Sequence, residues 1–277
     1  MNIEKIFNNN VVVALNDKGQ EIVVMGRGLG FKKRVGDLIE EGKIEKIFTL
    51  SNKDMSDKFE QLIAEIPMEH MVISEKIIKY AKTQLGKKLN DSIYISLTDH
   101  IHSAIERYKK GIQLKNALLW DTKRLYKDEF SVGKEALKMI EDKFDIELLE
   151  DEAAFIALHF VNAQLNEEMP IVMNITKVMQ EILNIVKYHY KIDFDEESLS
   201  YYRFITHLKF FAQRLFNKKC YNDSKDNELF DMIKSKYNDS YQCTKKIHKF
   251  IEGKYSYKLT KEERLYLTIH IERVVNK

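Results

Sequence analysis

Two different spacings of hydrophobic residues divide the chain near residue 66. Four short runs are predicted as strands, the inner two more clearly than the outer two: Ile3–Phe7, Val11–Leu15, Glu21–Met25 and Ile44–Leu50. The inner runs flank Asn16-Asp-Lys-Gly-Gln20, whose composition is typical of a hairpin turn. The pattern predicts a small antiparallel sheet, and we expect it to self-associate because so short a sheet buries little surface.

Beyond this segment the apolar residues recur with a helical period. Residues 57–66 place them at i, i+3, i+4 and i+7 and predict a short connecting helix. From residue 70 onwards the whole pattern is helical, and Ser74 and Gly86 are expected to cap the two ends of the first long helix.

An internal repeat organises the helical part. The stretch Glu152–Asn162 recurs as Glu263–Arg273, 111 residues later, with glutamate matching glutamate and histidine matching histidine. Ten upstream identities keep this register, from Asn116 with Asn227 to Leu148 with Leu259. This period is far longer than the roughly 20–50 residues of a solenoid repeat, so it indicates two copies of one helical domain.

Two prolines, Pro67 and Pro170, precede the two copies, and proline disfavours helix in the residue before it. The sequence therefore predicts a multidomain α+β chain with an antiparallel sheet domain, a linker helix and two all-α bundles. Their predicted bounds are 1–56, 57–66, 67–169 and 170–277.

Composition is that of an ordinary soluble globular protein, with 44% hydrophobic and 32% charged residues. A net charge of +2 means that any basic patch is local. Two cysteines form no disulfide framework and favour a reducing compartment. We find no signal peptide and no run of about 18 apolar residues, so we expect a cytoplasmic protein without membrane insertion.

Four of the eight histidines stand at repeat-related positions: His159 with His270, and His100 with His207. The second match has an offset of 107 rather than 111, so an insertion or deletion lies between the two registered blocks. A single histidine among apolar residues is most often a core residue. For four histidines at paired positions of a duplicated domain, a shared functional role is at least as favoured as a place in the core. Neutral imidazole is a competent nucleophile and can accept a phosphoryl group, which brings about −2 charge and oxygens that suit arginine.

The surroundings of the four histidines differ between the copies. Arg203 lies four residues before His207 and Arg273 three after His270, each one helical turn away. In the first copy, the positions three residues after His100 and His159 hold Ser103 and Asn162, which carry no charge. A different response of the two copies to phosphorylation is therefore left open.

A metal site is the rival use of these histidines. His100-x-His102 could supply ligands, but residues two apart on a helix point to different faces. The chain has no C-x-x-C or H-E-x-x-H pattern, no nucleotide-binding P-loop and no G-x-S-x-G elbow. We therefore predict no metal, no cofactor and no enzymatic activity.

A second constellation is Gly26-Arg-Gly-Leu-Gly-Phe-Lys-Lys-Arg34, where four cations surround Phe31. Burial and stacking on an unpaired base, which contributes roughly 1–3 kcal/mol, are equally favoured for this ring. The amides of Asn8-Asn-Asn10 could contact base edges or simply form a turn.

Together these stretches resemble one family, the sugar-responsive BglG/SacY/LicT transcriptional antiterminators of bacteria, and within it the β-glucoside-operon member. The resemblance covers essentially the whole chain. Its motifs are Asn8-Asn-Asn10, Val23-Val-Met-Gly-Arg-Gly-Leu-Gly-Phe31, Ile44-Glu-Lys-Ile-Phe-Thr-Leu50, Leu97-Thr-Asp-His-Ile101, Ala117-Leu-Leu-Trp120, His159, Phe204-Ile-Thr-His-Leu208 and Tyr266-Leu-Thr-Ile-His-Ile-Glu-Arg273.

The resemblance implies a dimeric RNA-binding domain that holds a leader-mRNA hairpin and keeps an overlapping terminator from forming. The residues that it implies at the RNA are Lys5, Asn8, Asn10, Gly26, Arg27 and Phe31. It also implies that a sugar permease (enzyme II) phosphorylates His100 and His159 and switches the protein off. The carrier protein HPr would phosphorylate His207 and His270 and switch it on.

Two other functions are weighed against this interpretation. A DNA-binding regulator with the same control domains is disfavoured because residues 1–50 are predicted as strands and lack a helix-turn-helix. An all-helical metal enzyme would need two of the paired histidines to converge with carboxylates.

Overall fold

The computed structural model describes residues 1–17, 19–49, 66–217 and 227–276. Two compact units are formed, the first by residues 1–115 with 131–164 and the second by residues 116–130 with 165–277. Within the described ranges, no helix combines the length and the apolar character that crossing a bilayer would require.

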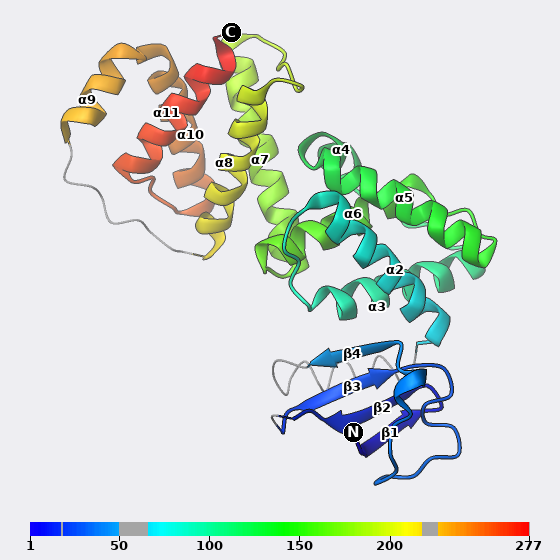
Figure 1. The fold of residues 1–277 in the computed structure, drawn as a ribbon. Coiled ribbons are helices and arrows are strands. Elements are labelled where there is room, and N and C mark those ends of the chain that lie inside the picture. Colours follow the sequence, from blue (N-terminus) through cyan, green and yellow to red (C-terminus); the bar gives the residue numbers. More distant parts are fainter. Residues whose placement is uncertain (18, 50–65, 218–226, 277) are drawn as a thin grey trace. The chain divides into compact units, whose positions relative to one another are not determined.

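The first unit begins with a four-stranded antiparallel sheet in the order β1-β2-β3-β4 (Figure 1). Its strands are β1 (Ile3–Asn8), β2 (Val11–Leu15), β3 (Glu21–Met25) and β4 (Lys46–Thr49). The predicted hairpin is confirmed: Leu15 pairs with Glu21, and the Gln20 amide donates to the Asn16 side chain at 2.9 Å. The two weaker runs form the edge strands, as predicted.

Alternation along the strands gives the sheet two apolar faces. One face buries Ile3, Val12 and Val24 together with Leu29 and Ile39 from the segment between β3 and β4. This segment, which includes the 3-10 helix η1 (Glu41–Lys43), therefore packs back over the sheet that it leaves.

The described residues that follow form ten α-helices in two series (Figure 1). The first series is α2 (Met68–Leu85), α3 (Ile93–Lys109), α4 (Leu119–Leu125), α5 (Lys127–Phe144) and α6 (Glu150–Leu165). The second is α7 (Met169–Tyr190), α8 (Leu199–Asn217), α9 (Asn227–Lys236), α10 (Asn238–Tyr255) and α11 (Lys261–Val275). Both ends of α10 lie 111 residues after those of α5, and α11 begins 111 residues after α6, so the duplication is confirmed.

Two local expectations have different outcomes. The prediction that Ser74 caps α2 is wrong, because α2 starts at Met68 after Pro67, and the Ser74 hydroxyl donates to the His70 carbonyl inside the helix at 2.7 Å. Gly86 does end the helix, with a left-handed φ of 59° that glycine adopts without strain. All but the last residue of the predicted linker helix, 57–66, lie outside the described residues.

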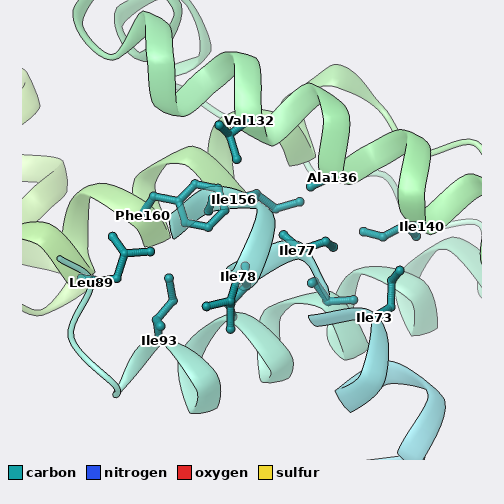
Figure 2. Close-up of a cluster of buried hydrophobic side chains, with 14 of the residues drawn as sticks. Ile73, Ile77, Ile78, Leu89, Ile93, Val132, Ala136, Ile140, Ile156 and Phe160 are labelled. Atoms are coloured by element: carbon teal, nitrogen blue, oxygen red, sulfur yellow. The ribbon is translucent and has the colours of Figure 1, made fainter. Parts of the chain in front are cut away.

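Branched side chains of α2, α3, α5 and α6 fill the core of the first helical series (Figure 2). Ile77 and Ile78 of α2 are fully buried, as are Ile140 of α5 and Phe160 of α6. This core holds α3 and α6 side by side, and both helices carry residues of the candidate site.

Candidate functional site

The first histidine pair joins α3 to α6. His100 of α3 and His159 of α6 lie with ring centroids 4.9 Å apart and planes inclined by 41°. The structure thus brings together two residues that are 59 positions apart in sequence, a contact that the repeat alone did not predict.

A buried carboxylate lies beside this pair. The Glu152 carboxylate lies 3.0 Å from His100 Nε2, and Arg107 donates to its other oxygen at 2.8 Å. Burial raises the pKa of Glu152, but the contacts with His100 and Arg107 outweigh this effect and leave the pKa below its usual value. Glu152 is therefore anionic at neutral pH and presents negative charge to the His100 ring.

The two rings of this pair expose different nitrogens. Nε2 of His100 and Nδ1 of His159 are shielded from solvent, and neither makes a hydrogen bond. The His100 nitrogen has the Glu152 carboxylate beside it as an ion-pair partner. Burial, and then the neighbouring His100, hold the pKa of His159 well below its ordinary value. His159 is therefore a neutral imidazole at physiological pH.

The second pair joins α8 to α11 in the same way but more closely. The ring centroids of His207 and His270 are 3.9 Å apart, with planes inclined by 31°, and the Tyr266 ring lies 5.6 Å from each. His207 is exposed, whereas only 8% of His270 is. Both rings line an open cavity of about 540 Å³.

Positive charge surrounds the second pair. Burial lowers the pKa of His270 to about 4, with smaller contributions from His207, Arg273 and Arg203. Burial, and then Arg214, lower the pKa of His207. Cations that disfavour a charged imidazole would stabilise a phosphoryl group on the same ring.

The carboxylate of the second copy has a different role. Glu263 stands where the first copy has Glu152, but it accepts hydrogen bonds from the Tyr257 hydroxyl at 2.9 Å and the Thr260 amide at 3.1 Å. The Glu263 amide in turn donates to the Thr260 hydroxyl, which completes a capping box at the start of α11. Glu263 thus stabilises a helix end, while Glu152 contacts a histidine.

A third histidine contact was not predicted from the sequence. Nδ1 of His70 in α2 lies 2.9 Å from Nδ1 of His102 in α3, and the two ring centroids are 5.1 Å apart. The repeat gives no signal for this pair, because Lys209 occupies the position that corresponds to His102. His100 and His102 face different helices, and nowhere in the described ranges do three or more possible ligands gather to hold a metal ion.

Two of the predicted RNA-contacting residues, Asn10 and Gly26, lie together where the β1–β2 turn meets the segment after β3. The Asn10 side chain accepts a hydrogen bond from the Gly28 amide at 2.8 Å, and the Gly26 amide donates to the Asn10 carbonyl at 2.9 Å. A Cβ atom at Gly26 would collide with the Lys43 carbonyl, and one at Gly30 with the Asn8 carbonyl. These glycines therefore allow the segment after β3 to pack closely against the backbone of Asn8 and Lys43.

Other side chains of this set point outward. Phe31 is 57% exposed, with the Lys32 ammonium 5.4 Å from its ring centroid, so of the two fates left open by the sequence the structure shows exposure. Lys5 and Arg27 are also exposed, and the Lys5 ammonium lies 5.0 Å from the Phe7 ring. We call these exposed side chains, Lys5, Arg27, Phe31 and Lys32, the Phe31 platform, in which the Lys32 ammonium lies over the Phe31 ring.

Comparison with known proteins assigns both parts of the chain. Residues 1–57 match the CAT RNA binding domain, and residues 75–163 and 180–274 each match the PRD domain. The crystal structure of GlcT CAT-PRDI is similar to 59% of this chain and 97% of its own, with a TM-score of 0.52 and 36% identity. The protein is thus a regulator with an RNA-binding sheet domain and two PRD domains.

Two relatives match over nearly the whole length. The chain is 65% identical to the transcription antiterminator LicT of Bacillus subtilis, covering 99% of each chain. It is 52% identical to a beta-glucoside operon antiterminator of Dickeya chrysanthemi, covering 99% of this chain and 96% of that protein. The chain belongs to this family of transcription antiterminators, which are not enzymes.

Proposed function

We propose that this antiterminator binds a hairpin in a leader mRNA that overlaps a terminator, and that histidine phosphorylation by the sugar phosphotransferase system controls it. β-Glucoside utilisation is the proposed process, because beta-glucoside operon control is what the name of one relative states. The observation that carries the proposal is the combination of an exposed aromatic platform in the sheet domain with two histidine pairs in the helical repeats.

The RNA contacts are proposed at the β1–β2 turn and the segment after β3, together with Lys5 of β1. Side chains cannot enter the narrow major groove of A-form RNA, so sequence recognition needs unpaired bases such as those of internal loops. Phe31 offers a ring for stacking, and Lys5 and Arg27 offer charge for the phosphates. Asn8 completes the contacting set, while Asn10 and Gly26 would act mainly by shaping the loop.

The regulatory contacts are proposed at the histidines. HPr would phosphorylate His207 and His270, where arginines favour the added charge, and would activate the protein. A sugar-specific enzyme II permease would phosphorylate His100 and His159 and inactivate it. We place this control in a cytoplasmic homodimer with domains at 1–56, 67–169 and 170–277, joined after the sheet by the linker 57–66.

Titration of the full-length chain with a leader hairpin RNA tests the RNA-binding role. We expect Phe31→Ala to weaken binding about tenfold or more, which corresponds to the roughly 1–3 kcal/mol of one base stack. Leu15→Ala is the matched control, because Leu15 is 43% exposed at the other end of β2 and lies outside the Phe31 platform. Equal affinity of Phe31→Ala and Leu15→Ala would reject the stacking role.

The same titration with duplex DNA of the leader sequence separates this function from its alternative. The RNA-binding proposal predicts tight binding to the hairpin and only salt-sensitive, nonspecific binding to the duplex. Tighter binding to the duplex would favour a DNA-binding regulator with the same control domains.

A further inference from the structure

In His100 and in His159, neighbouring groups cover one ring nitrogen. The other ring nitrogen is therefore the one that can accept a phosphoryl group. Nε2 of His100 lies 3.0 Å from the Glu152 carboxylate and is shielded from solvent, whereas Nδ1 is not shielded. In His159 the shielding is reversed, with Nδ1 covered. Neither covered nitrogen makes a hydrogen bond, but that of His100 lies beside a carboxylate. A phosphoryl donor therefore meets different ring nitrogens at the two positions.

A fixed partner beside Nε2 also determines where the proton of the neutral ring resides. A carboxylate accepts hydrogen bonds and does not donate them, so Glu152 favours the tautomer with the proton on Nε2 and the lone pair on Nδ1. Glu152 is held in turn by Arg107 at 2.8 Å. Nucleophile, orienting carboxylate and supporting cation stand in the order typical of an activated imidazole.

We infer that His100 of the first helical repeat accepts the phosphoryl group through Nδ1, with Glu152 as its positioning residue. This inference rests on the proposed phosphorylation of the first repeat and adds the atom, the isomer and the residue that selects it. Nothing in the sequence ranks His100 above His159, because both occupy repeat-related positions.

The transfer step balances without any additional reagent. The Nδ1 lone pair of neutral His100 attacks the phosphorus of a phosphorylated donor protein, and a P–N bond forms. The bond between phosphorus and the donor atom breaks, and its electron pair remains on the donor. The product ring keeps its proton on Nε2 and carries a positive charge, which the adjacent Glu152 carboxylate stabilises.

His159 lacks this support. Attack through its Nε2 would leave the positive charge near Nδ1, a buried atom with no acceptor. An unpaired buried charge is unfavourable, so His159 is the slower acceptor of the pair.

The second repeat carries the natural control. Glu263 is engaged by Tyr257 and Thr260, whose counterparts in the first repeat are Ile146 and Leu149. The apolar counterparts leave the Glu152 carboxylate available to His100. His207 therefore reacts without an orienting carboxylate, and its isomer is not fixed in this way.

The experiment determines the phosphohistidine isomer on the full-length chain. The chain is phosphorylated by a phosphorylated enzyme II permease and, in a second arm, by phosphoramidate, a small donor that needs no docking. The peptide that contains His100 is isolated, and antibodies that distinguish the two isomers identify the linkage. We expect the Nδ1-linked isomer in both arms, formed faster than any phosphate on His159.

Two substitutions test the role of the carboxylate. Glu152→Gln keeps the size of the side chain but removes its charge. Phosphorylation of His100 should then slow about tenfold, because the ion pair that stabilises the charged product ring is lost. The freed Nε2 should then give a mixture of isomers, which a purely structural defect would not produce. Glu263→Gln is the matched control and should change the phosphorylation rate of His207 less than about twofold.

The outcomes distinguish failure of this inference from failure of the proposed phosphorylation control. Phosphate on Nε2 of wild-type His100, or an unchanged isomer and rate in Glu152→Gln, would overturn the inference while leaving phosphorylation control intact. Phosphate on His100 from phosphoramidate but none from the permease would count against the proposed donor alone. No phosphate on His100 in either arm would overturn both.

Discussion

Gly133 of α5 lies against the carbonyl group of Ala153 in α6 so closely that a Cβ atom at Gly133 would collide with the carbonyl oxygen. This approach brings together two helices of the first repeat. The corresponding position in the second repeat is Thr244, whose hydroxyl accepts a hydrogen bond from Thr268 of α11 at 3.1 Å. Equivalent helices thus contact each other differently in the two repeats. The first repeat uses a close backbone contact at glycine, and the second uses a hydrogen bond between two threonine side chains.

The first prediction concerns this glycine. Gly133→Ala should lower the free energy of unfolding by about 1–3 kcal/mol, because the added methyl group forces the helices apart. Gly253→Ala is the control, since Gly253 is a helical glycine of α10 with no atom within 4 Å of an added Cβ. There alanine should stabilise the helix by up to about 1 kcal/mol. Chemical denaturation of both variants checks the signs, and equal effects would contradict the close contact.

The second prediction concerns the core in Figure 2. Ile77→Ala should destabilise the first unit by about 2–5 kcal/mol, because the side chain is fully buried and its loss leaves a cavity. Val72→Ala on the same helix should change stability by less than about 0.5 kcal/mol, because Val72 is 45% exposed. Thermal unfolding of the two variants provides the comparison, and a similar loss in both would show that α2 packs by another face.

The third prediction concerns the capping box of α11. Thr260→Ala removes the acceptor of the Glu263 amide and should cost about 1 kcal/mol. Thr260→Ser keeps the hydroxyl and should restore most of this stability. Denaturation midpoints of the two variants test the contact, and an alanine variant as stable as the serine one would disprove its contribution.

The fourth prediction concerns acid stability. The charged groups that influence His270 are His207 and Arg203 of α8 and Arg273 of α11, and the pKa of His270 falls from 6.5 to about 4. Between these values the unfolded chain binds the proton and the folded chain does not. Stability contributed by neutral His270 is therefore present above pH 6.5 and is lost as the pH falls toward 4.

Replacing His270 with glutamine should remove this dependence, which we put on the order of 2 kcal/mol after solvent screening. Denaturation of the wild type and of His270→Gln at pH 7 and pH 5 measures the difference. Parallel losses of stability in the two proteins on acidification would refute the assignment to His270.

Particular residues show what the sequence could predict. The two β-branched runs around Asn16–Gln20 predicted the central hairpin, because alternation and turn chemistry are local properties. The repeat predicted that His100 corresponds to His207 and His159 to His270, but the contact between the two histidines of each copy is seen only in the structure. Ser74 misled the prediction of the helix start, since its hydroxyl donates to a carbonyl inside α2 instead of accepting from a free amide.

Other features depend on contacts between distant segments. Whether Phe31 is buried or exposed cannot be read from its cationic neighbours, because the fold of the whole segment between β3 and β4 decides it. The different roles of Glu152 and Glu263 likewise cannot be predicted from the residue type, because both are glutamates at equivalent repeat positions. They follow from the residues three positions before each glutamate, Leu149 and Thr260, of which only threonine can complete a capping box.

The central claim is that phosphorylation of the second histidine pair governs antitermination by the RNA-binding sheet. Its most direct test is single-round transcription through a leader that carries the hairpin and its terminator, with the chain unphosphorylated or phosphorylated by HPr. We predict that readthrough rises with the phosphorylated wild type and stays low when His207 and His270 are replaced by alanine. Readthrough that is the same with both forms of the wild type would contradict the account.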